Sequence, residues 1–551
     1  MAGLTYKEKF PAGFPKLSPE QMDVVGEVAQ CRTYKDGDVL FRAGETEFMF
    51  HVIQKGNIEI IDRSGDEPTT LLVHEPFEFT GDIANLSGRT SNVDAVAKGA
   101  VEVYQICTEE LRQMIKEQPE LSDIILNAFM ARSKALIESD FTGLRVIGFE
   151  FSPNTFQIRE FLSKNNVIYT WIDLEKDADV GELMQRFNVK ESDTPIVAHG
   201  NEWLLRNPST IELAEKIGIK QELKEDIYDL VIVGGGPAGL AAAVYSSSEG
   251  LKTVVLERIA PGGQAGSSSK IENYLGFPTG VSGSELAERA TMQAEKFGAQ
   301  LSIPSMVSHL SFKNKFNVLE LETGEKIISK SLIIATGAEY KKLPVENLQK
   351  FEGRGVYYAA TKMEAAMCGD AEIAIVGGGN SAGQAAVFLS SGVQKIYLII
   401  RGDGLALTMS QYLAHRIEES GNIELLVNTE ITAINGEDHP ESIEIFNTTS
   451  KEKTEIKVSA IFSFIGAFPC TGWLTEDIEK DENGFIKTGS MVAKSSLWKE
   501  TRQPFLLETS RPGVFAAGDV RSNSIKRVSS AVGEGSMAVQ FVHEFLKEGG
   551  G

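Results

Sequence analysis

The chain has 551 residues, of which 42% are hydrophobic and 24% are charged, and these values are ordinary for a globular protein with several domains. Its formal net charge is -23, and lysines and arginines nowhere cluster densely enough to neutralise a phosphate backbone, so we expect no nucleic-acid partner. No run approaches the roughly 18 apolar residues of a spanning helix, and the first residues lack the apolar core of a signal peptide. We therefore expect a cytoplasmic protein with no membrane partner.

The cysteines show neither a CxxC pair nor the spacing of metal ligands, so we expect free thiols and no metal site. From residue 17 to residue 108, short apolar runs alternate with glycine turns, which is typical of a small β-barrel. Within it, the stretch 51–61 carries apolar residues on both sides of Gly56 and predicts a hairpin that turns there. Residues 109–137 then have apolar side chains at helical spacing and predict one helix.

Residues 16–138 resemble the cyclic-nucleotide-binding domain, in which a jelly-roll barrel holds the ligand and a C-terminal helix transmits its occupancy. The signature of that family is a Gly-Glu pair followed by an arginine that neutralises the cyclic phosphate. Here the corresponding cassette spans 79–91, its acid is the shorter aspartate, and its arginine comes about two residues early. The alternative is a degenerate barrel that serves only as an interface. The resemblance implies a regulatory site for a cyclic nucleotide or a dinucleotide at Gly81, Asp82, Arg89 and Thr90.

From residue 144 to residue 219 the pattern changes to alternating strands and helices, with a Thr194-Pro195 pair before the last predicted strand. The predicted elements are strand 145–150, helix 154–164, strand 168–174, helix 180–187 and strand 196–199. This order resembles the thioredoxin or glutaredoxin fold, in which the proline is cis and a CxxC opens the first helix because one thiolate attacks while the other resolves. The chain has Ser152-Pro-Asn-Thr155 at that point. No dithiol exchange can occur there, and we expect a spacer, a docking surface or a degenerate partner.

The stretch Val231–Leu240, VIVGGGPAGL, follows a buried strand and places three glycines at GxGxxG spacing before an alanine-rich helix. The first glycine permits a tight turn, the second lets the backbone approach a pyrophosphate, and the third lets helix and strand pack closely. The next predicted strand, 253–256, ends in Glu257, an acid placed to bind ribose hydroxyls. This unit predicts a dinucleotide with free ribose hydroxyls.

A second copy of the pattern occurs at Ile373–Ala382, IAIVGGGNSA. Its second strand, 395–400, ends in Arg401, which can pair with a 2'-phosphate that an acid would repel. We therefore expect NADPH here, with NADH as the alternative, at Gly377, Gly379, Asn380, Ser381, Ala382 and Arg401. Two such units in one chain imply that electrons pass between a nicotinamide and a flavin.

Five motifs in order identify the remainder of the chain with a family: PGGQ at 261–264, IENYLGFP at 271–278, IATGA at 334–338, GGGNSA at 377–382 and GVFAAGD at 513–519. Together they resemble the low-molecular-weight thioredoxin reductases. The resemblance implies that Gln264 and Asn273 lie near the isoalloxazine and that Asp519 hydrogen-bonds the ribityl chain. The expected FAD-binding residues are Gly234, Gly236, Pro237, Ala238, Gly239, Glu257, Gly263, Gln264, Asn273, Gly337, Gly518, Asp519, Val528 and Ser529.

The chain departs from this family at the position of its Cys-Ala-Thr-Cys dithiol, which passes electrons from flavin to thioredoxin. Ala359 and Lys362 stand in place of the two cysteines, and Cys368, six residues further on, cannot cycle as a disulfide alone. The family's Arg-Gln-Ala near the flavin appears as Arg527-Val-Ser529, and its arginine pair for the 2'-phosphate is reduced to Arg401-Gly402, for which Arg416 could compensate. These departures make thioredoxin reduction the least expected activity.

These patterns predict a multidomain fold with an N-terminal jelly-roll barrel and helices, a thioredoxin-like α/β domain, and two Rossmann-like domains. The expected bounds are 10–140 for the cyclic-nucleotide-binding-like domain, 143–222 for the thioredoxin-like domain, 226–345 with 472–551 for the FAD domain, and 346–471 for the NAD(P)H domain. We expect an FAD-dependent NADPH oxidoreductase that passes electrons directly to an unknown acceptor and that a nucleotide regulates. Ferredoxin-NADP reductase-like electron transfer and a sensor with a non-catalytic flavin are the alternatives. The family resemblance also implies a homodimer.

Overall fold

The computed structural model describes residues 6–46, 48–64, 68–82, 84–87, 90–137, 143–176, 193–199, 203–223, 227–268, 270–406 and 408–549. Arg89 and the predicted helix 180–187 lie outside these residues. The contacts between its residues in space divide the chain into two compact units. The first holds residues 1–148, 166–224 and 292–304, and the second holds residues 149–165, 225–291 and 305–551.

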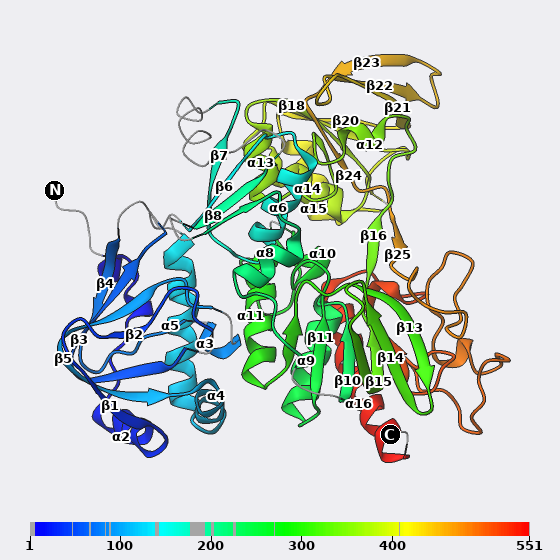
Figure 1. The fold of residues 1–551 in the computed structure, drawn as a ribbon. Helices are drawn as coiled ribbons and strands as arrows, with labels where there is room; N and C mark the ends of the chain where they lie inside the picture. The colour runs from blue at the N-terminus through cyan, green and yellow to red at the C-terminus, as the bar shows by residue number, and fades with distance from the viewer. Residues whose placement is uncertain are drawn as a thin grey trace. The chain divides into compact units, whose positions relative to one another are not determined.

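The first unit begins with an antiparallel sheet in the order β1-β5-β3-β4, with β2 paired to β5 (Figure 1). Its strands are β1 (Gln30–Tyr34), β2 (Val39–Phe41), β3 (Phe50–Asp62), β4 (Thr69–His74) and β5 (Asp94–Ile106). Alternate side chains of β3 enter two different cores, because successive residues of a strand point to opposite faces. Phe50 and Val52 pack with the neighbouring helices, whereas Ile53 packs with Phe41 and Phe48.

The hairpin predicted at Gly56 is wrong, because β3 is one continuous strand through that residue. Gly56 has φ +80°, and the register between β3 and β5 shifts on either side of Lys55. A Cβ at position 56 would lie 2.3 Å from the carbonyl oxygen of Ala100, so only glycine fits. The glycine therefore marks an irregularity within a long strand, of the kind that a β-bulge makes, and not a turn.

The helix predicted over 109–137 is two helices, α4 (Thr108–Glu117) and α5 (Pro119–Ile137). Pro119 lacks the backbone N–H that would continue α4, and the residue before a proline is biased away from helical geometry. Gln118 accordingly has φ -119° and ψ 86°. The other helices of this region are α1 (Tyr6–Lys9), η1 (Pro11–Gly13), α2 (Pro19–Val28) and α3 (Ala84–Ser87).

A second sheet of the first unit has the order β7-β6-β8-β9, in which β6 and β7 are parallel and the other pairs are antiparallel. Its elements are β6 (Leu144–Gly148), β7 (Tyr169–Asp173), β8 (Ile196–His199), β9 (Trp203–Arg206) and helix α8 (Thr210–Lys216). The Thr194–Pro195 peptide bond before β8 is cis. Helix α6 (Pro153–Lys164), which connects β6 to β7 along the chain, groups with the second unit.

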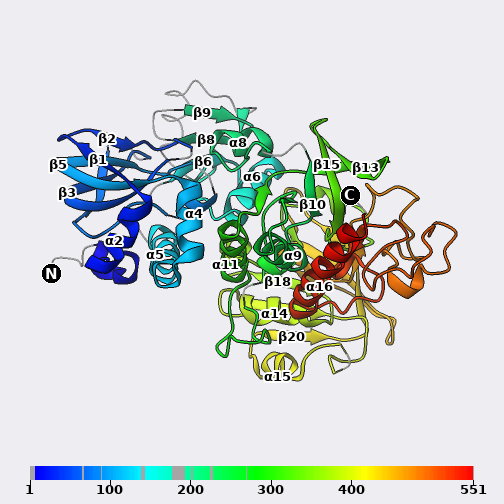
Figure 2. The ribbon, with the colours of Figure 1, turned by 90° about the horizontal axis from the view of Figure 1, so that it is seen from below.

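The second unit contains a large sheet in the order β11-β10-β15-β14-β13, with β26 beside β15. Its strands are β10 (Tyr228–Val233), β11 (Thr253–Leu256), β13 (Val307–Lys313), β14 (Phe316–Leu321), β15 (Lys326–Ile334) and β26 (Val514–Ala516). Strand β10 is parallel to both neighbours and buried at every position except Asp229, as expected of a parallel strand covered on both faces. Helix α16 (Val528–Lys547) lies along α9 (Pro237–Ser248), as Figure 2 shows.

The smaller sheet of the second unit is parallel and has the order β17-β24-β18-β19-β20. An antiparallel sheet β21-β22-β23 follows β20 along the chain. The strands are β17 (Val356–Tyr357), β18 (Glu372–Val376), β19 (Lys395–Ile399), β20 (Ile423–Leu426), β21 (Thr429–Asn435), β22 (Ser442–Asn447), β23 (Lys453–Lys457) and β24 (Ala460–Ser463). Helices α13 (Lys362–Cys368), α14 (Asn380–Leu389) and α15 (Gln411–Glu419) belong with it.

A two-stranded ribbon joins the large sheet to the smaller parallel sheet (Figure 1). The chain leaves β15 through β16 (Ala338–Tyr340) and returns through the antiparallel β25 (Ala467–Pro469).

The remaining elements are α10 (Gly263–Gly266), α11 (Gly283–Lys296), β12 (Gln300–Ser302), α12 (Leu348–Phe351), η3 (Gly489–Met491) and η4 (Gly518–Val520). Among the described residues, no helix is both long and apolar enough to cross a membrane.

Candidate functional site: two glycine turns

The glycine turn after β10, which we call the first cradle (residues 234–239), has the geometry that its sequence predicts. Gly234 has φ +108°, and a Cβ on Gly239 would lie 1.9 Å from the carbonyl oxygen of Gly234, so helix α9 and β10 pack too closely for a side chain. A Cβ on Gly236 would meet only the Cα of Gly263, at 4.0 Å. No side chain caps the N-terminus of α9, so its first N–H groups face this open space. The first cradle therefore fits a pyrophosphate.

Glu257, the predicted ribose acid, directly follows β11 and lies against the first cradle. Its Oε2 accepts a hydrogen bond from the Gly235 N–H at 2.6 Å, and its Oε1 accepts one from the Ile259 N–H at 2.9 Å. A Cβ on Gly235 would lie 3.1 Å from Oε2. The carboxylate is thus held beside the turn by two backbone donors.

Residues 262–263 contact the first cradle, and the Ala335 carbonyl lies against its first glycine. The Gly262 N–H donates to the carbonyl of Gly235 at 2.7 Å, which brings α10 and its Gly263 beside the turn. The Gln264 side-chain amide donates to the carbonyl of Ala338 at the start of β16. Gly337, with φ +66°, has no atom within 4 Å of its Cβ position. Asn273, in contrast, is exposed.

The C-terminal motif of the large sheet also meets the first cradle. Ala238 of α9 contacts both Gly518 and Gly535, whose Cβ positions would lie 3.1 Å from the Ala238 Cβ and 2.1 Å from its carbonyl oxygen. The motif continues into Asp519, and burial raises the pKa of that carboxyl, which makes a hydroxyl partner favourable. Val528 and Ser529 are the first two residues of α16.

Glu534 was not predicted from the sequence, yet it fixes this motif in place. Its Oε2 accepts from the Gly518 N–H at 2.7 Å, and its carboxylate forms an ion pair with Arg521 at 2.5 Å. The available signal was a single carboxylate within the otherwise small and apolar stretch of α16. Buried carboxylates in such a setting are expected to be paired.

The turn after β18, which we call the second cradle (residues 377–382), repeats this geometry. Gly377 has φ +141°, and its Cβ position lies 2.6 Å from the carbonyl oxygen of Phe464. A Cβ on Gly379 would meet only a carbonyl oxygen at 4.0 Å, so this glycine also faces open space. Ala382 is fully buried in the core of the smaller parallel sheet. The second cradle therefore also fits a pyrophosphate.

Polar residues of the second cradle contact neighbouring loops. The Asn380 Oδ1 accepts from the Ser410 N–H at 2.7 Å, and the Ser381 Oγ accepts from the hydroxyl of Tyr340 in the ribbon at 3.0 Å. Tyr340 was not predicted, because nothing in its local sequence indicates which turn it reaches. Arg401 follows the end of β19, and its side chain is exposed.

Arg416, which the sequence offered as a second residue for that phosphate, is engaged elsewhere. Its guanidinium forms two hydrogen bonds with the carboxylate of Glu272, at 2.7 and 3.2 Å. This bond to Arg416 lowers the pKa of Glu272, although partial burial opposes the shift. The pair joins α15 of the smaller parallel sheet to the loop that carries Asn273.

The segment in place of the family's dithiol contains no sulfur atom at either cysteine position. Ala359 is half-buried, and Lys362 is exposed at the first turn of α13. Thr361 caps this helix through the Met363 N–H at 3.2 Å, and its own N–H donates to the Glu364 carboxylate at 2.8 Å. Burial raises the pKa of the Cys368 thiol to about 12, so it stays protonated and unreactive.

In the predicted nucleotide cassette, the described polar residues already bind protein atoms. The Asp82 Oδ1 accepts from the Ala84 N–H at 2.8 Å, and the Thr90 hydroxyl donates to the carbonyl of Ile217 at 2.7 Å. Gly81 has φ +90°, and its carbonyl accepts from Arg132 of α5 at 2.5 Å. Arg132 also donates to the carbonyl of Phe79 at 2.9 Å. Arg132, a buried residue of α5, therefore holds the backbone of the cassette.

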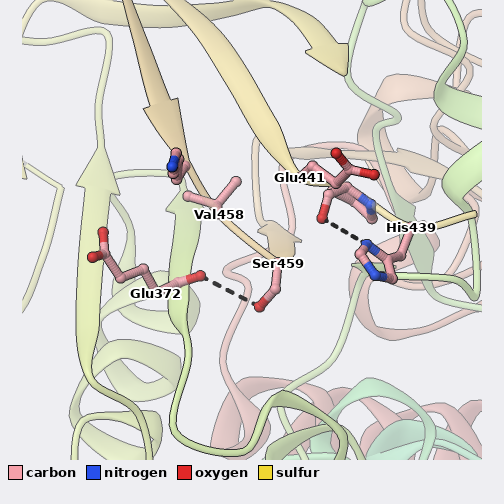
Figure 3. Close-up of a pocket in the computed structure, with 7 residues that line it drawn as sticks. Glu372, His439, Glu441, Val458 and Ser459 are labelled. Atoms are coloured by element: carbon pink, nitrogen blue, oxygen red, sulfur yellow. Dashed lines mark hydrogen bonds between the residues drawn. The ribbon is translucent and has the colours of Figure 1, made fainter. Parts of the chain in front are cut away.

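A cavity of about 290 Å³ lies where the inner strands β18 and β24 of the smaller parallel sheet begin (Figure 3). It is lined by Glu372, His439, Pro440, Glu441, Lys457, Val458 and Ser459. The Ser459 hydroxyl donates to the carbonyl of Glu372, and the His439 ring contacts the carbonyl of Pro440 (Figure 3). None of the predicted cofactor residues lines it.

Within the described part of the chain, no group of three or more His, Cys, Asp or Glu residues is placed to hold a metal ion.

Comparison with known proteins bears on both halves of the chain. Residues 228–535, more than half of the chain, match the family described as pyridine nucleotide-disulphide oxidoreductase, and residues 31–118 match the cyclic nucleotide-binding domain. The chain is 34% identical over 323 residues to the thioredoxin reductase of Mycoplasmopsis pulmonis, covering 58% of this chain and 98% of the relative. It is 32% identical over 326 residues to that of Bacillus subtilis, covering 59% and 96%.

Among solved structures, it is similar to thioredoxin reductase from Lactococcus lactis in the FR conformation, with 31% identity and a TM-score of 0.53 over 58% of this chain and 99% of that one. The thioredoxin reductase of T. acidophilum has 28% identity and a TM-score of 0.52 over 58% and 99%. These matches confirm, at the level of the family, the resemblances to thioredoxin reductases and to the cyclic nucleotide-binding domain. The resemblance of residues 144–219 to thioredoxin stays a prediction. The chain belongs to the pyridine nucleotide-disulphide oxidoreductase family, as an oxidoreductase similar to thioredoxin reductases that also carries a cyclic nucleotide-binding domain.

Proposed function

We propose that this chain is an FAD-dependent NADPH oxidoreductase that passes electrons from the flavin directly to an acceptor, without a dithiol relay. The domain bounds that go with this proposal are 226–345 with 472–551 for FAD and 346–471 for NADPH, preceded by a nucleotide-binding domain at 10–140 and a thioredoxin-like domain at 143–222. When bound, FAD supplies a ring that accepts hydride from the nicotinamide and donates electrons onward.

The chain's own residues would hold the two cofactors. The open space over Gly236 and over Gly379 is what two pyrophosphates need, and a Cβ would fill it. Glu257, held by two backbone N–H groups, would bind ribose hydroxyls, and the half-buried Asp519 would accept from the ribityl chain. Arg401, exposed after β19, would pair with the 2'-phosphate of NADPH.

The proposal that no dithiol relay operates rests on Ala359 and Lys362, which stand in place of the two cysteines. A relay needs two thiols that can form one disulfide, and neither of these side chains contains sulfur. The nearest cysteine in the sequence, Cys368, is 7% exposed, and its raised pKa removes the thiolate that exchange requires. Electrons would therefore leave without passing through a disulfide at this position.

Regulation by a nucleotide would act through the cassette at Gly81, Asp82, Arg89 and Thr90. Thr90 donates to the carbonyl of Ile217, and a Cβ on Gly218 would lie 2.1 Å from the Thr90 Cγ2, so the cassette and the end of α8 fit closely together. A phosphate bound by Thr90 would compete for this hydroxyl. The cassette would thus report ligand occupancy to the sheet that follows it.

The test is an anaerobic mixing experiment with the flavin-loaded protein. NADPH should bleach the flavin absorbance, and a quinone or oxygen should restore it, whereas oxidised thioredoxin should not. A flavin that stays oxidised with NADPH, or rapid reoxidation by thioredoxin, would refute the proposal.

Thermal-shift screening of cyclic mono- and dinucleotides tests the regulatory part, because a ligand that binds the folded state raises the unfolding temperature. Size-exclusion chromatography with light scattering tests whether the chain forms the homodimer that the family resemblance implies.

A further inference from the structure

Helix α6 packs against the body of the second cradle, by which we mean the smaller parallel sheet with its helices. The Phe156 ring stacks on the Tyr357 ring with centroids 5.7 Å apart and planes at 30°. Tyr357 is 3% exposed and belongs to the core of this sheet, so Phe156 extends that core. The fit is close, because a Cβ on Gly353 would lie 3.3 Å from the Phe156 ring. Next to the last residue of α6, the Ser163 hydroxyl contacts the Met363 sulfur at 3.9 Å.

The other end of α6 binds the body of the first cradle, by which we mean the large sheet with its helices. Asn165, the C-cap of α6, is 5% exposed, and its side-chain amide donates to the carbonyl of Ile259 at 2.9 Å. The same amide donates to the carbonyl of Phe161 at 2.8 Å and so fixes the end of the helix. Ile259 in turn donates its N–H to Glu257. Asn165 therefore holds the loop that positions the predicted ribose acid.

The two bodies are otherwise joined by a slender covalent connection. The ribbon has three residues in each strand, and it is extended by hydrogen bonds from the Lys341 N–H to Gly466 and from the Cys470 N–H to Gly337. A two-stranded ribbon of this length twists easily, since it has no third strand and little buried apolar surface of its own. In this arrangement the bodies also meet through the exposed ion pair between Arg416 and Glu272. Such a pair contributes little to stability.

We propose that helix α6 is a clamp within the chain, which binds both bodies at once and holds the first and second cradles in one arrangement. The partner that the surface around Tyr357 accepts is thus this chain's own helix. The clamp has a partly buried aromatic contact near its N-terminus and a buried amide at its C-cap.

Amide hydrogen exchange of the full-length, flavin-loaded protein tests this proposal at both ends of α6. Asn165→Ala removes the hydrogen bond to the first body. Phe156→Ala removes the aromatic contact with the second body and leaves the weaker contact between Ser163 and Met363 in place. If α6 is a clamp, each substitution releases the opposite body as well. Asn165→Ala should speed exchange in peptides covering 356–365, and Phe156→Ala should speed exchange in peptides covering 257–263. Each effect should be about fivefold, which is typical of losing one hydrogen bond in the first case and one aromatic pair in the second.

The matched control is Gln157→Ala, an exposed position on the same helix, which should change neither set of peptides. Asn165→Asp and Phe156→Leu, which keep the volume of the side chains more closely, serve if an alanine variant does not fold. Changes confined to the body that each substitution touches would overturn the clamp. This readout does not depend on turnover, so a protein whose flavin NADPH fails to bleach would refute the proposed function while leaving the clamp to be judged by exchange alone.

Discussion

Gly236 and Gly239 lie three residues apart in the first cradle, and the same substitution should affect them in opposite ways. In Gly239→Ala, the new methyl carbon would lie 1.9 Å from the Gly234 carbonyl oxygen and 3.3 Å from the Ile232 side chain, so α9 must move away from β10. Overpacking of this kind costs about 1 to 3 kcal/mol. We therefore expect the flavin-free Gly239→Ala protein to unfold at a lower temperature than the unsubstituted protein.

In Gly236→Ala the nearest protein atom to the new methyl carbon is 4.0 Å away, and the backbone has φ -72° and ψ -176°, which any residue adopts. The folded protein should tolerate the change and even gain up to about 1 kcal/mol, because alanine restricts the unfolded chain more than glycine does. The methyl group occupies the space left for the pyrophosphate. We expect FAD to bind at least about tenfold more weakly, which corresponds to roughly 1.4 kcal/mol.

The two expectations are separated by measuring stability and binding on the same samples. Calorimetry of the flavin-free proteins gives the unfolding temperature, and titration with FAD, followed by the change in flavin fluorescence, gives the dissociation constant. Loss of stability in Gly236→Ala with normal FAD binding would show that this space is structural and refute the first cradle as a pyrophosphate site. A Gly239→Ala protein as stable as the unsubstituted one would contradict the packing argument.

Three further outcomes are expected. Arg401→Ala should raise the KM for NADPH about tenfold, the loss of one phosphate contact, while leaving the KM for NADH within about twofold; equal effects on both nucleotides in steady-state assays would remove Arg401 from the site. Glu534→Gln, which loses the charge that holds the Gly518 N–H and Arg521, should weaken FAD binding about fivefold by fluorescence titration, and unchanged binding would contradict its positioning role. Burial lowers the pKa of His51 from 6.5 to about 4, so between these pH values the unfolded chain binds a proton that the folded barrel does not bind. His51 should therefore contribute a loss of roughly 3 kcal/mol in stability as the pH drops from 6.5 to 4, and burial lowers the pKa of His74 in the same way. In urea unfolding monitored by hydrogen exchange of β3, His51→Phe should remove the contribution of His51 and leave that of His74, and an unchanged pH dependence would contradict this assignment.

Local sequence was sufficient for the elements that hold the cradles. The first glycine of each turn and Gly239 follow from a backbone requirement, because a Cβ at Gly239 or Gly377 would meet a carbonyl oxygen within 2.6 Å in the structure. Such requirements act between residues that are near in sequence or in adjacent strands of one βαβ unit, so a short pattern contains them.

Two sequence predictions were wrong because a single residue changes the structure that its pattern indicates. Gly56 was interpreted as a turn, although a positive φ also serves an irregularity within a long strand such as β3. Pro119 was overlooked within a helical pattern, although proline ends a helix for steric reasons that the sequence already contained. Both errors concern the course of one element and not the position of the site.

Contacts between distant segments could not be predicted from sequence, because no local pattern specifies them. The pairing of Arg416 with Glu272, the hydrogen bond from Tyr340 to Ser381 and the bond from Asn165 to Ile259 each join residues from 41 to 144 positions apart. Such contacts depend on how whole elements are placed. The thioredoxin-like domain, whose helix α6 contacts both bodies, was accordingly expected only as a spacer, a docking surface or a degenerate partner.

The central claim is that electrons leave the flavin without a dithiol, and counting electrons tests it most directly. An anaerobic titration of the FAD-loaded protein with NADPH measures how many reducing equivalents each protomer accepts before excess NADPH absorbance accumulates. A flavin alone accepts two electrons, so the account predicts an endpoint at one NADPH per flavin. An endpoint at two NADPH per flavin would reveal a second two-electron acceptor, such as a disulfide, and contradict the account.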